Sequence, residues 1–171
     1  MVPADDALSP SFEAFFAAEY RRVVGLAFVL CGRRGLAEEL AQDAFVKAYQ
    51  HWSRVSTYDE PGAWVRRVVA NLATSSFRRG VREARALTRL AARRPAPDEL
   101  PLDDPDFWSA VRGLPKRQAQ CVALHYLEDR PTAEIAAVLD ISEPTVRVHL
   151  HRGRLALATT LCEPLDEEEA P

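Results

Sequence analysis

Residues 132–157 read TAEIAAVLDISEPTVRVHLHRGRLAL, and this stretch predicts a helix, a tight turn and a second helix. The first helix carries Ile135 and Leu139, an apolar pair one turn apart. Ala136 is small enough for the second helix to approach closely, and Asp140 begins the turn. The stretch is therefore predicted to be a helix-turn-helix of the DNA-binding type.

The second helix of this motif is expected to follow Ser142, whose hydroxyl is placed to cap it, with Glu143 and Pro144 in the first turn. One side is apolar at helical spacing and can pack on the first helix. The other side combines basic residues with an apolar one, as a major-groove helix requires, although a solvated basic face is the alternative. The residues predicted to contact duplex DNA are Thr145, Arg147, Val148, His149, His151 and Arg152.

The charges of the chain are segregated along its 171 residues, so the net charge of -3 conceals a local basic stripe. Nine arginines lie between Trp64 and Pro95, where Glu83 is the single acid. Five acids follow within residues 98–106, and five more lie in residues 163–169. A local stripe of this kind is what attracts phosphates, so nucleic acid remains an expected partner.

Neither the first ten residues nor the three cysteines suggest secretion, a membrane span or a metal site. The start, MVPADDALSP, lacks a basic and apolar leader, and the longest apolar run is far shorter than the roughly 18 residues of a membrane span. We expect a cytoplasmic protein without membrane insertion. Cys121 and His125 share a helix face but lack a second pair of ligands, so no metal or cofactor is expected.

The whole chain predicts an all-α fold of two small helical domains joined by a flexible linker, the C-terminal one containing the helix-turn-helix. In the N-terminal half, helices are expected from a cap at Ser9 or Ser11, from about Leu36 to Trp52, and from about Ala63 to Arg79, where Gly80 ends the helix. The proline-rich, acidic stretch from Pro95 favours a linker. The predicted divisions are an N-terminal domain at 10–92, a linker at 93–105, a C-terminal domain at 106–162 and an acidic tail at 163–171.

Two helices of the N-terminal half carry candidate binding surfaces. The third helix places arginine pairs on a side that is expected to be exposed. Trp64 and Asn71 lie next to them and suit stacking on and hydrogen bonding to unpaired bases, although core packing explains Trp64 equally well. The second helix has an acidic side that is typical of a protein-docking surface or of an ordinary core boundary. The candidates for nucleic acid are Trp64, Arg66, Arg67, Asn71, Arg78 and Arg79, and those for protein docking are Glu38, Glu39, Gln42, Asp43 and Phe45.

Three segments together resemble the extracytoplasmic-function (group 4) sigma factors of bacterial RNA polymerase, within the sigma-70 family. They are AEELAQDAFVKAYQHW at 37–52, PGAWVRRVVANLA at 61–73 and LPKRQAQCVALHYLEDRPTAEIAAVLDISEPTVRVHLHRGR at 114–154. The resemblance implies that the first segment, in region 2.2, docks on the β′ clamp helices of core polymerase. The second, similar to regions 2.3 and 2.4, would open the -10 element and hold its non-template strand, with Asn71 reading a flipped base. The third, similar to region 4, would read the -35 element.

The resemblance also implies core RNA polymerase, including its β subunit, promoter DNA and an anti-sigma factor as partners. Val148 and His149 stand where many members have Ser and Arg, so the -35 preference of other members is not carried over. We further hypothesise that the acidic linker and tail screen the basic stripe until polymerase separates the domains.

Two alternatives remain open from the sequence. A stand-alone helix-turn-helix regulator would need a ligand-binding or dimerising N-terminal domain, whereas a wholly helical half with arginine pairs is predicted here. An enzyme acting on nucleic acid would need a carboxylate cluster or a nucleophile paired with a base. Because the acids of this chain lie on a docking face, a linker and a tail, we expect no enzyme.

Overall fold

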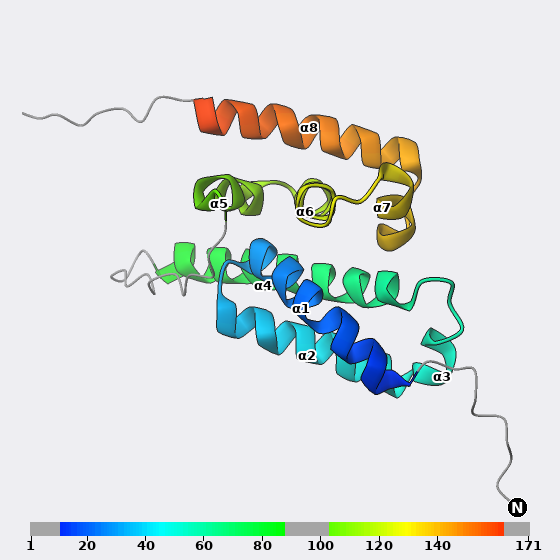
Figure 1. Cartoon of the computed structure of the whole chain (residues 1–171). Coiled ribbons are helices and arrows are strands. Elements are labelled where there is room, and N and C mark those ends of the chain that lie inside the picture. The colour runs from blue at the N-terminus through cyan, green and yellow to red at the C-terminus, as the bar shows by residue number, and fades with distance from the viewer. Residues whose placement is uncertain (1–10, 88–102, 163–171) are drawn as a thin grey trace, which may run out of the picture.

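The computed structural model describes residues 11–87 and 103–162, and every regular element within these ranges is an α-helix (Figure 1). The expected all-α fold is confirmed. The linker and tail predictions fall almost entirely outside the described residues, so the structure describes neither as a whole. None of the described helices is long and apolar enough to span a membrane.

The N-terminal unit contains α1 (Phe12–Cys31), α2 (Arg34–Gln50), the short α3 (Trp52–Val55) and α4 (Pro61–Leu87). Ser11 caps α1 by accepting a hydrogen bond from the Ala14 amide at 3.2 Å, which selects it over Ser9. Gly32 ends the helix with a φ of 75°, a left-handed conformation that glycine adopts without strain. The apolar sides of α1, α2 and α4 face one another and form the core of this unit.

Helix α4 differs from its prediction at both ends. It begins at Pro61, where a missing N–H costs nothing in the first turn, and not at Ala63. It also continues through Gly80 to Leu87, so the prediction that Gly80 ends it was wrong. A single glycine costs a helix only about 1 kcal/mol, and no proline follows before residue 95.

The C-terminal unit contains α5 (Pro105–Gly113), α6 (Lys116–Glu128), α7 (Thr132–Leu139) and α8 (Glu143–Cys162). Asp104 caps α5 by accepting from the Phe107 amide at 3.0 Å. Asp129 and Asp140 end α6 and α7 with positive φ angles, a conformation that Asp tolerates better than most residues. The turn at Asp140 joins α7 to α8 and confirms the predicted helix-turn-helix.

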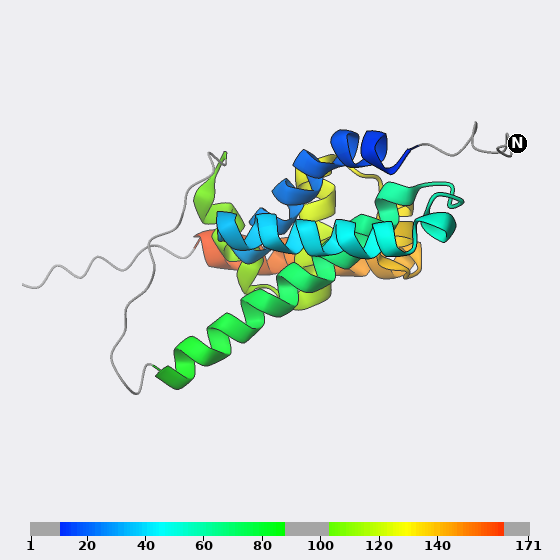
Figure 2. The same ribbon diagram turned by 90° about the horizontal axis from the view of Figure 1, so that it is seen from below.

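The two units pack against each other and share one continuous cluster of buried apolar residues. Helices α5, α6 and α7 lie between α8 and the N-terminal unit (Figure 1), and contacts join α1 to α5 and α6, and α4 to α6 and α7. The view from below shows α4 running diagonally beneath this layer (Figure 2). One side of α4 is therefore covered by the C-terminal unit, whereas α8 lies on the far side of that unit.

Candidate nucleic-acid interface

Helix α8 presents the surface that the sequence predicted. Its apolar side is buried against the rest of the C-terminal unit, and the Ser142 hydroxyl accepts from the Thr145 amide at 3.3 Å. On its other side Arg147, Val148, His151 and Arg152 are exposed, while Thr145 is half-buried. Exposed arginines beside an apolar side chain are the groups that a major-groove helix needs. The buried side comprises Val146, Leu150, Gly153 and Leu157, as predicted.

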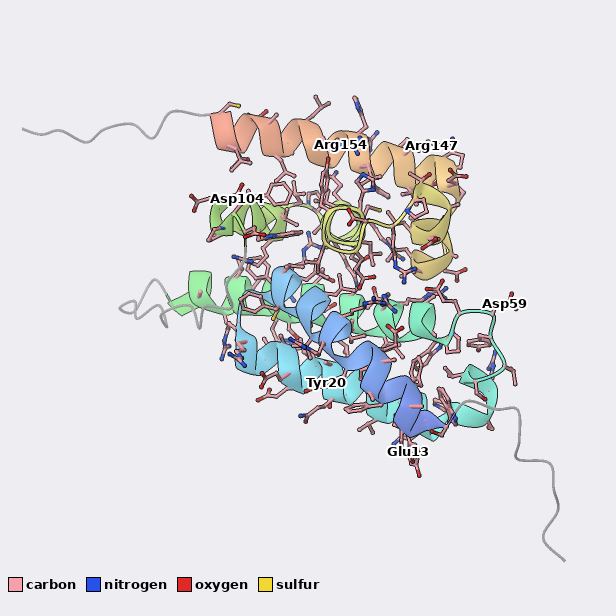
Figure 3. The ribbon with its side chains drawn as sticks, in the orientation of Figure 1. Glu13, Tyr20, Asp59, Asp104, Arg147 and Arg154 are labelled. Carbon is pink, nitrogen blue, oxygen red and sulfur yellow. The ribbon has the colours of Figure 1, made fainter. Side chains whose placement is uncertain are left out.

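Arg147, which is labelled on α8 in Figure 3, bonds to the first turn of its own helix. Its Nη2 donates to Glu143 Oε1 at 2.6 Å, and the same oxygen accepts from the Thr132 hydroxyl of α7 at 2.6 Å. The hydrogen bond from Thr132, followed by the charge of Arg147, lowers the pKa of Glu143. The carboxylate thus stays ionised and restrains the guanidinium at the start of the predicted recognition helix.

His149 occupies a more enclosed position on α8 than Arg147, Val148, His151 and Arg152. It is half-buried, and its Nδ1 has no hydrogen-bond partner among the described residues. Burial, and then the positive charges of Arg117 and Arg152, lower the pKa of this imidazole. His149 is therefore neutral at pH 7 and does not hold a phosphate by charge, unlike Arg147 and Arg152.

Arg66 on α4 is buried, contrary to the expectation that it is exposed. Only 1% of the residue is accessible. Its Nη2 lies 2.7 Å from Glu19 Oε2 of α1, and its Nε lies 2.6 Å from Glu128 Oε2 of α6. The physical reason is the helix period, because Arg66 shares the covered side of α4 with Gly62, Val69 and Ala73. In this arrangement no nucleic acid reaches its guanidinium.

Arg67 and Asn71 also contact the C-terminal unit. Arg67 donates from Nε to the Val138 carbonyl at 2.7 Å and from Nη2 to the Ala137 carbonyl at 2.8 Å, at the C-terminal end of α7. Asn71 accepts from Gln120 Nε2 at 3.1 Å. Both side chains are half-buried, so the expected free exposure of Arg67 is wrong, and the amide oxygen predicted to read a base is already bonded.

The remaining candidates on α4 have different surroundings. Arg78 and Arg79 are exposed, as predicted, and lie just over one turn beyond Thr74, the last buried residue described on the helix. Trp64 is half-buried and packs against the common core. The structure thus separates the predicted single-stranded-DNA residues into a covered group, Arg66, Arg67 and Asn71, and an accessible pair of arginines.

Helix α2 carries the predicted docking face with one correction. Glu39, Gln42 and Asp43 are exposed, and Glu38 is half-buried and paired with Arg34 at 3.1 Å. Phe45 is 2% exposed, because it shares a helix side with Ala41 and Ala48 and packs among the rings of α1. It was therefore wrong to place the Phe45 side chain on the surface.

The apolar groups beside the exposed acids are Val46 and Tyr49, which are 54% and 63% exposed. They follow Gln42 one and two turns later, so helical spacing from the acidic residues could have identified them. They line a groove of about 530 Å³ between α1 and α2, with Phe45 also in its lining. The docking face, defined here as Glu39, Gln42, Asp43, Val46 and Tyr49, thus combines acids with exposed apolar area.

The described residues contain no group of three or more His, Cys, Asp or Glu side chains able to hold a metal ion. Burial raises the pKa of the Cys121 thiol to about 12 and also raises the pKa of Cys31. Both thiols are therefore protonated at neutral pH, whereas Cys162 at the end of α8 is exposed.

Two family models match the chain in separate segments. The model of sigma-70 region 2 matches residues 15–84, and the model of sigma-70 region 4 matches residues 106–157. The first segment contains most of α1, all of α2 and α3 and most of α4, and the second contains most of the helix-turn-helix unit. The DNA candidates of α4 therefore lie in region 2, and those of α8 lie in region 4.

Named relatives give the same family. The chain is 30% identical to the ECF RNA polymerase sigma factor SigE of Mycolicibacterium smegmatis, over 95% of this chain and 66% of that protein. It is 30% identical to the RNA polymerase sigma-E factor of Streptomyces coelicolor, over 73% of this chain and 71% of that protein. It spans only 38% of the probable sigma factor RfaY of Xanthomonas campestris, at 26% identity.

Among solved structures, the fold resembles that of the sigma factor RpoE from Bartonella quintana, crystallised in complex with the anti-sigma factor NepR. The TM-score is 0.66 at 23% identity, covering 88% of this chain and 96% of the other. This likeness supports the fold. The two region matches and the 30% identical relatives show that the chain belongs to the sigma-70 family, in its extracytoplasmic-function group.

Proposed function

We propose that this chain binds core RNA polymerase and directs it to promoters for the start of transcription. The observation that carries this function is the presence of two dissimilar binding surfaces in the order of sigma regions 2 and 4. One is an acidic and apolar docking face on α2, and the other is an exposed basic helix in a helix-turn-helix. A stand-alone regulator would need the second surface but has no use for the first.

In this proposal, α8 reads the -35 element in the major groove. Arg147 and Arg152 donate to base edges or phosphates, and Val148 contacts a thymine methyl group. Thr145, His149 and His151 complete the predicted contact surface. The support is the exposure of the basic residues and the restraint of Arg147 by Glu143, which fixes its direction before DNA binds.

Region 2 is proposed to hold the single non-template strand of the -10 element. Arg78 and Arg79 are accessible phosphate contacts, whereas Arg66, Arg67 and Asn71 become accessible only after the C-terminal unit leaves α4. Trp64 is proposed to stack at the edge of the opened duplex. The roles of Trp64, Arg66, Arg67 and Asn71 follow from the family motif at 61–73, and those of Arg78 and Arg79 follow from their exposed place on α4.

The docking face is proposed to bind the β′ clamp helices of core polymerase, and region 4 to contact the β subunit. Its acids complement a basic partner surface, while Val46 and Tyr49 supply apolar area beside them. Phe45 is buried beneath the docking face and lines the groove between α1 and α2. Such a protein works where polymerase does, in the cytoplasm, and an anti-sigma factor is a further proposed partner because the structural relative from Bartonella quintana binds one.

The experiment is co-elution of the purified chain with bacterial core RNA polymerase on a sizing column. We expect the wild type to co-elute and Asp43→Arg to lose at least about tenfold in affinity, because a cation replaces a carboxylate at the centre of the docking face. Asp59→Arg is the matched control, since it makes the same charge change at an exposed acid of the loop before α4. Phe45→Ala is unsuitable because Phe45 is a core residue.

The outcomes distinguish a sigma factor from a stand-alone helix-turn-helix regulator. Loss of co-elution in Asp43→Arg alone supports both the sigma function and the docking face. Failure of the wild type to bind core polymerase, together with tight binding to duplex DNA, would favour the stand-alone regulator.

A further inference from the structure

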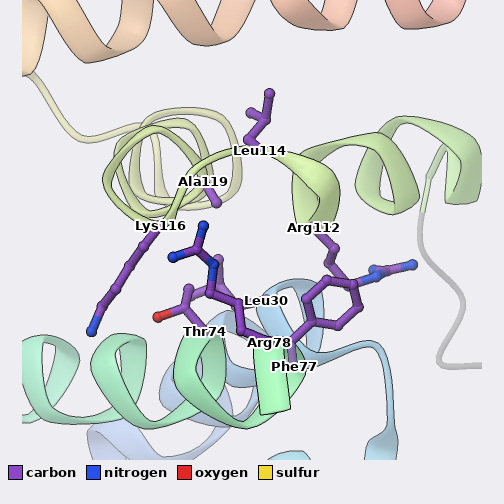
Figure 4. A pocket seen from close by; sticks show the side chains of 8 residues that line it. All are labelled: Leu30, Thr74, Phe77, Arg78, Arg112, Leu114, Lys116 and Ala119. Carbon is purple, nitrogen blue, oxygen red and sulfur yellow. The ribbon is translucent and has the colours of Figure 1, made fainter. Parts of the chain in front are cut away.

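The cavity at the junction of α1, α4, α5 and α6 is too small for a ligand as large as a base. It is lined by Arg78, Arg112, Lys116 and mainly apolar neighbours, and its volume is only about 10 Å³ (Figure 4). That volume holds about one water molecule. A base is therefore recognised at the surface, and the start of α8 is a place where polar side chains from two helices meet there.

Glu143 at the start of α8 is hydrogen-bonded through one of its two carboxylate oxygens. Its Oε1 accepts from the Thr132 hydroxyl of α7 at 2.6 Å and from Nη2 of Arg147 at 2.6 Å. Within residues 11–87 and 103–162, Oε2 makes no hydrogen bond, and it is not one of the buried atoms that lack a partner. The side chain is 37% exposed. Oε2 is therefore free to accept a hydrogen bond from another molecule.

The contact with Thr132 distinguishes Glu143 from an acid that only complements the helix dipole. Such an acid is favourable in the first turn without any partner on another helix. Here the hydroxyl of a residue 11 positions earlier fixes the carboxylate. The same hydrogen bond, followed by the charge of Arg147, lowers the pKa of Glu143. The carboxylate is therefore ionised at neutral pH and acts only as an acceptor.

Glu143 also lies in the part of α8 that is placed to meet base edges. The recognition helix of a helix-turn-helix contacts bases with its N-terminal residues. Arg147 follows Glu143 by one turn and its side chain is 64% exposed. Apart from the bond to Glu143, its N–H groups make no hydrogen bond in the part of the chain that the structure describes. The two side chains thus present an anionic acceptor and cationic donors next to each other.

The four bases differ in how well they match a carboxylate in the major groove. Guanine presents the N7 and O6 acceptors and thymine presents the O4 acceptor, so both repel an anion. Adenine combines its N6 amine with the N7 acceptor, whereas cytosine presents its N4 amine alone. An ionised carboxylate at position 143 is therefore matched best by cytosine.

We infer that Glu143 is a specificity-determining residue of α8, and that its Oε2 accepts a hydrogen bond from the N4 amine of a cytosine in duplex promoter DNA. Thr132 and Arg147 hold the carboxylate by its other oxygen. This inference rests on the proposed role of α8 in reading the -35 element. It adds an anionic acceptor to a contact surface whose other charged members are arginines.

The first test selects duplexes from a random-sequence DNA library with the purified full chain at low salt, and then sequences them. We expect the wild type to enrich cytosine over thymine about tenfold at one position, which is within the range for one hydrogen-bonded base contact. Glu143→Ala is expected to reduce this preference to less than about twofold, because no acceptor then faces the amine.

Glu13→Ala is the matched control and is expected to leave the cytosine preference unchanged. Glu13 is an exposed acid in the first turn of α1, a helix of 20 residues like α8. Figure 3 shows Glu13 on the opposite side of the molecule from Arg147. Circular dichroism checks that both variants keep the helix content of the wild type.

Glu143→Gln separates reading of a base from positioning of Arg147. The amide oxygen is expected to keep the two donors that Oε1 binds, which places the NH₂ group where Oε2 was. A donor then faces the base, so the preference is expected to change from cytosine to guanine or thymine at the same position. A residue that only positions Arg147 would leave this position unchanged and alter the preference at neighbouring base pairs.

The inference is overturned if the wild type shows no cytosine preference, if the preference survives in Glu143→Ala, or if Glu143→Gln still selects cytosine. These outcomes are independent of the co-elution experiment. A chain that binds core polymerase but fails the selection tests refutes the role of Glu143 alone. A chain whose cytosine preference depends on Glu143 but which fails to bind core polymerase refutes the sigma function and leaves the base contact standing.

Discussion

Helices α8 and α4 are both predicted to contact promoter DNA, but their basic sides differ in exposure in the free chain. The basic side of α8 faces away from the N-terminal unit and is exposed from Arg147 to Arg152, except for His149. The corresponding side of α4 is covered, with Arg66 1% exposed. The difference teaches that burial, and not ion pairing alone, decides whether a basic residue on a predicted DNA-binding helix is available, because Arg147 is paired with Glu143 and still exposed, whereas Arg66 is paired and buried.

The largest expected effect is on the covered helix. Arg66→Ala leaves Glu19 and Glu128 without their shared cation, so we expect the free energy of unfolding to fall by about 3 kcal/mol. Urea unfolding followed by circular dichroism measures this. Arg79→Ala is the matched control on the same helix, since Arg79 is exposed, and it is expected to change stability by less than about 0.5 kcal/mol. Equal effects of the two substitutions would contradict the buried network.

A smaller effect is expected on the exposed helix, and it concerns binding. Arg147→Ala should weaken affinity for a duplex selected for tight binding by about 2 kcal/mol, as for the loss of one bidentate contact to a base. Stability should hardly change because the pair with Glu143 is on the surface. Electrophoretic mobility shift at fixed salt measures the affinity. Retention of full affinity would remove Arg147 from the contact surface.

The smallest effect concerns His149, which is half-buried on α8. Its pKa is lowered on folding, so the unfolded chain binds this proton more readily. The contribution of His149 to stability is thus complete above its ordinary pKa near 6.5 and decreases as the pH falls from there towards the folded-state pKa. NMR titration should place the imidazole below 6.5, and Arg117→Ala should raise it. A pKa above 6.5 would contradict the enclosure described here.

The helix-turn-helix was predictable to the residue because its signals are local. Val146, Leu150, Gly153 and Leu157 recur at helical spacing, and Ser142 precedes the helix that it caps. The family motif at 37–52 likewise predicts a docking face on α2, where Glu39, Gln42 and Asp43 are exposed. Helical spacing also indicates that Phe45 faces inward, since Ala41 and Ala48 on the same side of the helix are core residues.

The contact between the two units could not be predicted in the same way. Arg66 and Glu128 are 62 positions apart, and Arg67 and Val138 are 71 apart, with no periodicity that connects them. An arginine is also the same letter in the sequence whether its side chain binds DNA or a carboxylate. The burial of Arg66 was nevertheless indicated by its place on the side of α4 occupied by Gly62 and Val69.

The partners of Arg66 are chemically close to the ligand that its helix is proposed to hold. Carboxylate and phosphate both offer anionic oxygens that a guanidinium can grip, so Glu19 and Glu128 imitate the DNA backbone within the protein. Because of this mimicry, the residues that hold Arg66 inside the protein are different from the residues that contact DNA. Substitutions at positions 19 and 128 are expected to change how firmly the Arg66 guanidinium is held, while the DNA-contacting residues stay the same.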